Sequence, residues 1–210
     1  MRLAYRAVII PSSFAALAGC ASAPASSGAP AATASTAVAA QPATTAVASQ
    51  AARPAPPARH ADVESIDAIL GALYDVISGP PGQRRDWDRM RSLFVPGARL
   101  IPTGRRPDGT GAIQVRDVEQ YIAASGPFLE SNGFFEREIA RRTERYGNVV
   151  HAFSTYESRH TASDPAPFAR GINSIQLWFD GKRWFVVTIY WEGESPSNPI
   201  PARYLQSSGS

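Results

Sequence analysis

The most regular alternation of apolar and polar residues lies near the C-terminus, in residues 170–192, where two strand-like runs flank Asp180 and Gly181. An Asp-Gly pair between such runs predicts a β-hairpin with a two-residue turn, because this turn needs positive φ at both central positions. The turn would place Leu177 opposite Trp184 and so fix the register of the whole hairpin. Both faces of the second strand are apolar, which indicates that something covers each of them.

Apolar residues at helical spacing precede this hairpin and predict three helices, at residues 63–77, 84–94 and 118–124. Asp117 stands where it can cap the third helix. Strand-like patterns follow at residues 100–101, 112–115, 134–145 and 149–160, with a Gly147-Asn148 turn between the last two. Helices followed by a long antiparallel meander predict an α+β fold, with three helices ahead of the main sheet.

The first twenty residues have the features of a secretion signal. Two arginines precede a mostly apolar run at residues 7–19, which is too short to span a bilayer and has the length of a signal-peptide core. The run ends in Leu-Ala-Gly before Cys20, the only cysteine, and this ending resembles the lipobox of bacterial lipoproteins. The resemblance implies lipidation of Cys20 and export to a membrane, the outer one if the source has two. The alternative is an ordinary signal peptide cut near Ala21.

The next stretch, residues 21–61, is rich in Ala, Pro, Ser and Thr and has no aromatic residue. Such a segment cannot bury enough apolar surface to offset the entropy of ordering, so it is expected to be a flexible tether. The expected organisation is a signal peptide at 1–19, a lipidated cysteine and tether at 20–61, one domain at 62–205 and a disordered tail at 206–210.

Charge argues against a nucleic-acid partner. The net charge of +3 over 210 residues arises in the N-terminal part, because all 18 acidic residues lie at or after Asp62 while four of the 21 basic ones precede it. The domain is therefore near neutral and offers no electrostatic footprint for a phosphate backbone. With a single cysteine, an intramolecular disulfide and a zinc finger are excluded as well.

The order of two helices, a short strand, a third helix and a long meander resembles that of the nuclear transport factor 2-like superfamily, including its SnoaL-like cyclases and ketosteroid isomerases. The Asp180-Gly181 turn before an aromatic-rich last strand is typical of its uncharacterised bacterial members. The resemblance covers about residues 62–205. It implies a strongly curved antiparallel sheet around helices, a cone with an apolar pocket, and dimers formed through the outer sheet face.

The resemblance does not carry a mechanism with it. The isomerases of this superfamily use an aspartate base on the strand after the second helix, with tyrosine and an acid as oxyanion donors. The corresponding strand here, residues 98–102, has no acid, and the last two strands contain no aspartate. Fold alone does not assign a reaction.

Polar side chains on the presumed inner face of the hairpin and the strand before it are the candidates for lining a pocket. They are Tyr156, Asn173, Thr188, Tyr190 and Glu192. The alternative is that the tyrosines are core aromatics and that Asn173 satisfies neighbouring backbone. Glu157, with Arg159 and His160, could form an acid-base cluster, although a solvated strand end explains this run equally simply.

The opposite face of the hairpin is the candidate dimer surface, because a contiguous apolar patch marks an interaction site. Its members are Trp178, Phe185, Val187, Ile189 and Trp191. The leading hypothesis is a homodimeric envelope lipoprotein that binds a small apolar ligand, without cofactor, metal or nucleic acid. Two alternatives stay open: a SnoaL-like cyclase, isomerase or dehydratase that uses Tyr, Asn and Glu side chains, and a structural module that acts through the outer face.

Overall fold

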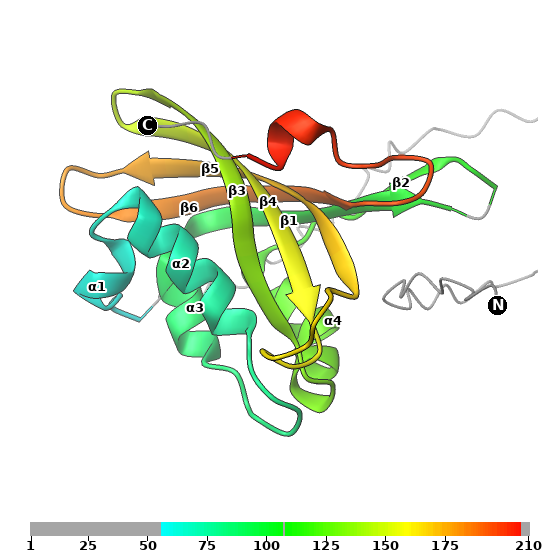
Figure 1. Cartoon of the computed structure of the whole chain (residues 1–210). Coiled ribbons are helices and arrows are strands. Elements are labelled where there is room, and N and C mark those ends of the chain that lie inside the picture. The colour runs from blue at the N-terminus through cyan, green and yellow to red at the C-terminus, as the bar shows by residue number, and fades with distance from the viewer. Residues whose placement is uncertain (1–55, 107, 207–210) are drawn as a thin grey trace, which may run out of the picture. The chain divides into compact units, whose positions relative to one another are not determined.

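The computed structural model describes residues 56–106 and 108–206 (Figure 1). The predicted signal peptide, Cys20, most of the tether and residues 207–210 lie outside the described residues. The helices are α1 (His60–Val63), α2 (Ile66–Ile77), α3 (Trp87–Leu93), α4 (Val118–Ser131) and the short 3₁₀ helix η1 (Ala202–Tyr204). None of the described helices is long and apolar enough to cross a membrane.

Six strands form one curved sheet in the order β2-β1-β6-β5-β4-β3. They are β1 (Phe94–Arg105), β2 (Gly111–Ile113), β3 (Phe135–Tyr146), β4 (Val149–Arg159), β5 (Ala169–Phe179) and β6 (Trp184–Gly193). The predicted α+β class is confirmed, and so is the turn at Gly147, where φ is +56°. The sheet departs from the predicted antiparallel order at one pair of strands, since β1 pairs parallel with β6. Between β1 and β3 the chain crosses from one edge of the sheet to the other, and the meander β3-β4-β5-β6 then returns to β1.

Local sequence explains where the helices begin. The Ser65 side chain accepts a hydrogen bond from the Ala68 amide at 3.0 Å, which caps α2. Asp117 and Gln120 form a complete capping box at the start of α4, as the sequence predicted for Asp117. The predicted first helix corresponds to α2, with α1 as a separate short helix that ends at Val63, and the third predicted helix runs on to Ser131 despite Pro127.

The apolar core lies between α2, α3 and the concave face of the sheet (Figure 1). Its fully buried side chains come from both layers, for example Ile69 on α2 and Ile175 and Val186 on the sheet. Burial of one such side chain contributes about 1.5–3 kcal/mol to stability. The helices therefore stay on the concave side because only that face offers them a continuous apolar surface.

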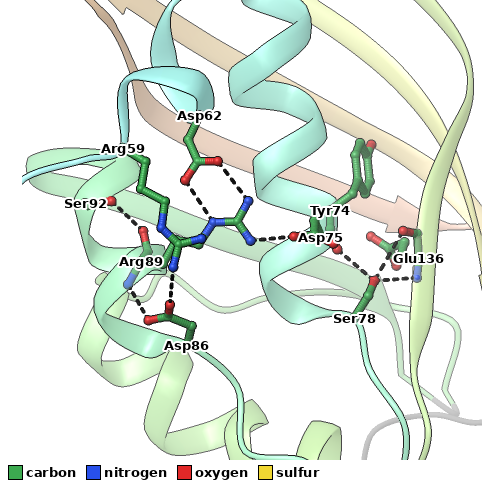
Figure 2. Close-up of polar contacts among 9 residues, drawn as sticks. All are labelled: Arg59, Asp62, Tyr74, Asp75, Ser78, Asp86, Arg89, Ser92 and Glu136. Atoms are coloured by element: carbon green, nitrogen blue, oxygen red, sulfur yellow. Dashed lines mark hydrogen bonds and ion pairs between the residues drawn. The ribbon is translucent and has the colours of Figure 1, made fainter.

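An ion-pair cluster ties the three N-terminal helices together (Figure 2). Arg89 on α3 donates to both carboxylate oxygens of Asp62 on α1, at 2.8 and 2.9 Å, and also to Asp75 on α2. The hydrogen bond from Arg89 lowers the pKa of Asp62. A bidentate guanidinium-carboxylate pair fixes orientation as well as distance, so this contact sets how the helices meet.

The predicted two-residue turn of the last hairpin is wrong. Phe179 pairs with Trp184, so four residues form the loop, and both the Lys182 and Arg183 amides donate to the Asp180 carboxylate, at 2.7 and 2.8 Å. No residue other than glycine has positive φ in the described chain, which excludes the type I′ turn at Asp180. The side chain of Asp180 organises the loop instead.

Because of a β-bulge in β6, the predicted faces of this strand are also wrong beyond Val187. Leu177 pairs with Val186 and Gln176 pairs with Thr188, so Val187 is an extra residue without a partner on β5. An extra residue shifts the alternation by one position, and everything beyond it points to the opposite face. Trp184 and Val186 are thus buried before the bulge, but Ile189 is the buried residue after it.

The convex face of the sheet is partly covered by the C-terminal segment. The Tyr204 ring packs on Phe153 of β4 with a centroid separation of 4.9 Å, and its carbonyl accepts a 2.6 Å hydrogen bond from Thr155. Arg142 of β3 donates to the Arg203 carbonyl. η1 therefore lies on the side of the sheet opposite α2, as Figure 1 shows.

Deletion of Val187 tests the bulge. Because Val187 is the extra residue, its removal leaves the β5–β6 pairs in register with Ile189 and Trp191 still inward, so we expect the unfolding free energy to fall by only about 1 kcal/mol. Deletion of Tyr190, which lies beyond the bulge, should cost about 3 kcal/mol or more, because Trp191 would then turn outward and Glu192 inward. Urea denaturation followed by tryptophan fluorescence measures both, and equal stabilities of the two variants would contradict the assignment of Val187 as the extra residue.

Candidate functional site

A chain of hydrogen bonds crosses the interior between α2 and the sheet. Asn173 Nδ2 on β5 donates to Tyr74 Oη at 3.1 Å, and Tyr74 Oη lies 2.7 Å from Ser154 Oγ on β4. Ser154 in turn donates to the Glu138 carboxylate on β3. An ionised carboxylate only accepts hydrogen bonds. Ser154 therefore donates its hydroxyl proton to Glu138, and Tyr74 donates its own to Ser154. Tyr74 is therefore held as an acceptor toward Asn173.

A second carboxyl, Glu136, lies two residues earlier on β3 and points to the same side. Ser158 Oγ donates to it at 2.8 Å. Burial raises the pKa of Glu136 to about 7, and hydrogen bonds from Ser158 and Asn173 oppose this rise. Its backbone amide is fixed separately, by a 3.0 Å hydrogen bond to Ser78 at the end of α2 (Figure 2).

Three tyrosines from three elements surround Glu136: Tyr74 on α2, Tyr121 on α4 and Tyr156 on β4. Burial, followed by the nearby charge of Glu136, raises the pKa of each hydroxyl, so all three stay protonated at neutral pH. Tyr121 also packs edge-on against Trp191, which keeps α4 over β6. Glu136 is thus a half-buried carboxyl surrounded by tyrosine hydroxyl groups.

The Tyr156 hydroxyl has no hydrogen-bond partner among the described residues, although the side chain is only 7% exposed. The one fully enclosed polar side-chain atom without a partner in this part of the chain is Arg183 Nε, so the Tyr156 oxygen borders open space. Gly171 faces it across the β4–β5 pair, and a Cβ there would collide with the hydroxyl. The glycine thus makes room for this group.

A groove of about 790 Å³ runs between α2 and the edge strand β3, and Tyr74 and Glu136 line it. Its apolar lining includes Leu70 and Phe135. Acidic and basic side chains line the rest and are largely paired with one another. Arg141 contacts Asp67 and Glu138, and Arg137 and Arg159 share Glu157, each at 2.7 Å. The groove is consequently more polar than the apolar pocket expected from sequence.

No group of three or more His, Cys, Asp or Glu side chains within residues 56–106 and 108–206 could hold a metal ion. The chemistry that these residues offer is hydrogen bonding and proton exchange. Glu136 is suited to both, since a carboxyl with a pKa near the working pH populates both protonation states.

Comparison with known proteins gives information on the fold alone. No protein-family model matches the sequence, and no curated protein is significantly similar to it. Solved structures do match. The chain resembles nuclear transport factor 2-like proteins.

Three of these structures illustrate the likeness. A nuclear transport factor 2-like protein of unknown function from Silicibacter pomeroyi is 12% identical, with 62% of this chain and 94% of the other covered and a TM-score of 0.42. One from Shewanella baltica is 14% identical, with 60% and 89% covered and a TM-score of 0.39. A superfamily member from Salmonella enterica is 18% identical, with 66% and 89% covered and a TM-score of 0.41. The likeness concerns the fold and says nothing of ligand or reaction.

Two of the five residues predicted to line a nuclear transport factor 2-like pocket point inward, namely Tyr156 and Asn173, which are both 7% exposed. The inward direction predicted for the other three is wrong: Thr188, Tyr190 and Glu192 follow the bulge and lie on the convex side, where Tyr190 is 47% exposed. Glu157, the acid-base candidate, is a buried ion-pair partner of Arg137 and Arg159.

The predicted dimer face divides at the same bulge. Trp178 is 41% exposed, and Phe185 and Val187 are half-buried on the same convex side. The outward direction predicted for Ile189 and Trp191 is wrong, because Ile189 is 7% exposed and Trp191 packs on the core.

Three site residues were not predicted: Tyr74, Tyr121 and Glu136. The sequence holds a signal for Glu136, because Glu136 and Glu138 lie on one face of a strand. The arginines that alternate with them make surface ion pairing an equally good explanation. The two tyrosines lie on helices whose inward faces also carry ordinary core residues, so the sequence alone gave no reason to single them out.

Glu136→Gln should change stability in a pH-dependent way. The pKa of Glu136 is raised from 4.5 to about 7 in the folded state. Its stabilising contribution is therefore present below pH 4.5 and is lost as the pH rises through 7. We expect the Gln variant to be about 2–3 kcal/mol more stable than the wild type at pH 8 and nearly equal to it at pH 4. Urea unfolding at both pH values measures this.

Glu144→Gln is the matched control, since Glu144 lies further along β3 with its side chain 87% exposed. Its stability difference should stay within about 0.5 kcal/mol of zero at both pH values. A Glu136 variant that behaves like this control would contradict the burial of the Glu136 charge.

Proposed function

We propose that the domain binds a small organic molecule in the groove between α2 and β3, with Glu136 as its central polar contact. The observation that carries this proposal is the placement of the Glu136 carboxyl at the groove, held by Ser158 and Asn173. A buried carboxyl stabilised only by neutral groups is costly to keep in a folded protein. A site that recognises a ligand explains why the cost is tolerated.

The polar lining of the groove also bears on the kind of ligand. Tyr156, whose hydroxyl has no partner among the described residues, lies on the neighbouring strand β4 and is not one of the lining residues. The wholly apolar ligand expected from the sequence suits this lining less well than a molecule with one polar group. Leu70 and Phe135 would contact its apolar part.

Proton-transfer catalysis is a second candidate, favoured by the pKa of Glu136 near 7. A general base or acid works best when its pKa is close to the operating pH. Glu136 would exchange the proton with the substrate. This version of a SnoaL-like isomerase or dehydratase uses Glu136 in place of Glu157 or Glu192. Loss of turnover in Glu136→Gln with ligand binding retained would be its signature.

We also propose that two copies associate through the open part of the convex face. Trp178 packs on Phe185 with a centroid separation of 5.6 Å, and the Arg183 guanidinium lies 3.7 Å from the Phe185 ring centre. With Val187 they form an apolar patch of the kind that marks an interface. Lipidation of Cys20, which concerns residues outside the described part, stays a prediction that the mass of the mature N-terminal peptide decides.

Native mass spectrometry of the full chain, purified gently from its own host, tests the ligand proposal. We expect a bound small molecule whose affinity falls about tenfold in Glu136→Ala, because the central polar contact to the ligand is lost. Glu144→Ala is the matched control, since the Glu144 side chain is 87% exposed on the same strand. Equal retention by both variants, or a protein that retains nothing from a host extract, would count against the site.

For the dimer, Trp178→Glu should yield monomer, because a charge placed at the centre of an apolar interface must be desolvated without a partner. Tyr146→Glu adds the same charge at an exposed turn and should leave the mass unchanged. Light scattering on the purified chains distinguishes the two outcomes, and an unchanged mass for Trp178→Glu would rule out this face.

A further inference from the structure

Asn173 is a polar residue in the middle of β5, on the concave side of the sheet that also carries the core. It pairs with Ser154 on β4, and both residues are more than nine-tenths buried. Asparagine is depleted in strands, and a buried amide group is costly to keep unless its donors have partners. The contacts of its NH2 group therefore call for an explanation.

The two hydrogens of this NH2 group serve two different acceptors. Asn173 Nδ2 donates to Tyr74 Oη at 3.1 Å, and Asn173 also hydrogen-bonds the Glu136 carboxylate on β3. An ionised carboxylate only accepts, so both contacts use the nitrogen of the amide. The amide is thereby fixed in one orientation, because turning it over would place its oxygen against the carboxylate.

The contact with Tyr74 extends the influence of this amide to a second carboxylate. Tyr74 Oη accepts from Asn173 and directs its own proton to Ser154 Oγ at 2.7 Å. Ser154 then donates to Glu138 on β3. Hydrogen bonds in such a chain polarise and strengthen one another. Asn173 therefore acts on the Glu138 carboxylate through two hydroxyl groups.

A β-bulge in β3 makes the two carboxylates unequal. Glu138 and Ala140 pair with consecutive residues of β4, so Ile139 is an extra residue. Glu138 and Arg141 are three positions apart and would lie on opposite faces of a regular strand. The extra residue brings them to one face, where they contact at 3.5 Å. Glu138 thus has a cation beside it, whereas the side chains that donate to Glu136 are neutral.

We propose that Asn173 is the positioning residue of the groove, because it holds Glu136 directly and Glu138 through two hydroxyl groups. The two carboxylates line the groove together with Tyr74, whereas Asn173 and Ser154 are not among its lining residues. The inference rests on the proposed groove-binding function and explains how the polar wall of that groove is built. One amide keeps both carboxylates as acceptors toward a ligand.

The titratable and charged groups around the two carboxylates come from four elements. They are Asp67 and Tyr74 on α2, Tyr121 on α4, Tyr156 on β4 and Arg141 on β3. Of these, Arg141 is the cation, and it contacts Glu138. The ionised form of Glu136 therefore depends on the hydrogen bonds that it accepts.

NMR titration of the Glu136 and Glu138 carboxyl carbons in the full chain, from about pH 3 to 9, tests the proposal. Glu136→Gln and Glu138→Gln assign the two signals. Asn173→Ala should raise both titration midpoints, that of Glu136 by about one pH unit, because a hydrogen bond to a charged group is lost. Gln176→Ala should move neither midpoint. It is the matched control, since Gln176 is an amide of the same strand on the convex face.

Tyr74→Phe separates positioning from a loss of packing. It removes the hydroxyl that connects the amide to Ser154 with little change of shape, so the Glu138 midpoint should rise while the Glu136 midpoint does not. In this background Asn173→Ala should still raise the Glu136 midpoint but no longer that of Glu138, since the chain between them is already broken. If Asn173→Ala fails to fold, Tyr74→Phe alone decides.

An unchanged Glu138 midpoint in Tyr74→Phe overturns the proposal, and so does an equal rise of both midpoints in that variant. A Glu138 midpoint that Asn173→Ala moves equally with and without the Tyr74 hydroxyl overturns it as well. These measurements need no ligand. A chain that retains no small molecule from its host, while both midpoints move as expected, therefore counts against the groove function and leaves the positioning role of Asn173 in place.

Discussion

The extra residue in β6 determines which side chains reach the interior of this domain. Val187 has no partner on β5, and from that point the alternation along the strand is reversed. Ile189 and Trp191 consequently close the core, and Trp191 can pack against Tyr121 on α4. Tyr121 is one of the three tyrosines around Glu136, so the position of α4 over the site depends on the bulge that accommodates Val187 in a neighbouring strand.

The site itself combines two kinds of carboxyl on one strand. Glu138 is connected to Arg141 and, through Ser154, to Tyr74. Glu136, two positions away, has only neutral partners. The difference follows from depth, because Glu138 is near enough to the groove rim to meet an arginine and Glu136 is not. In pairs of this kind the surroundings give two identical groups different pKa values. One group can then stay ionised while the other exchanges a proton.

Much of the fold could be predicted from the sequence, because periodicity and turn chemistry are local. The helix start at Asp117 and the turn at Gly147 follow from the residues at those positions. The faces of the last strand could not be predicted, since a bulge is decided by packing on the neighbouring strand and Val187 looks like any other strand residue. The site was partly predicted through Tyr156 and Asn173. Glu136 was not, because an acid on an arginine-rich edge strand reads as a surface residue until burial is known.

The C-terminal segment limits the symmetry that an assembly of this domain can have. Helix η1 lies against the convex face at β3 and β4, where the Arg203 carbonyl accepts from Arg142 and Tyr204 packs on Phe153 and accepts from Thr155. Only the part of that face toward β6 and β1 is open. In a pair with two-fold symmetry the rotation axis would then pass near Trp178 and Phe185. The concave sides would face away from each other, and each groove would open to solvent on its own side of the pair.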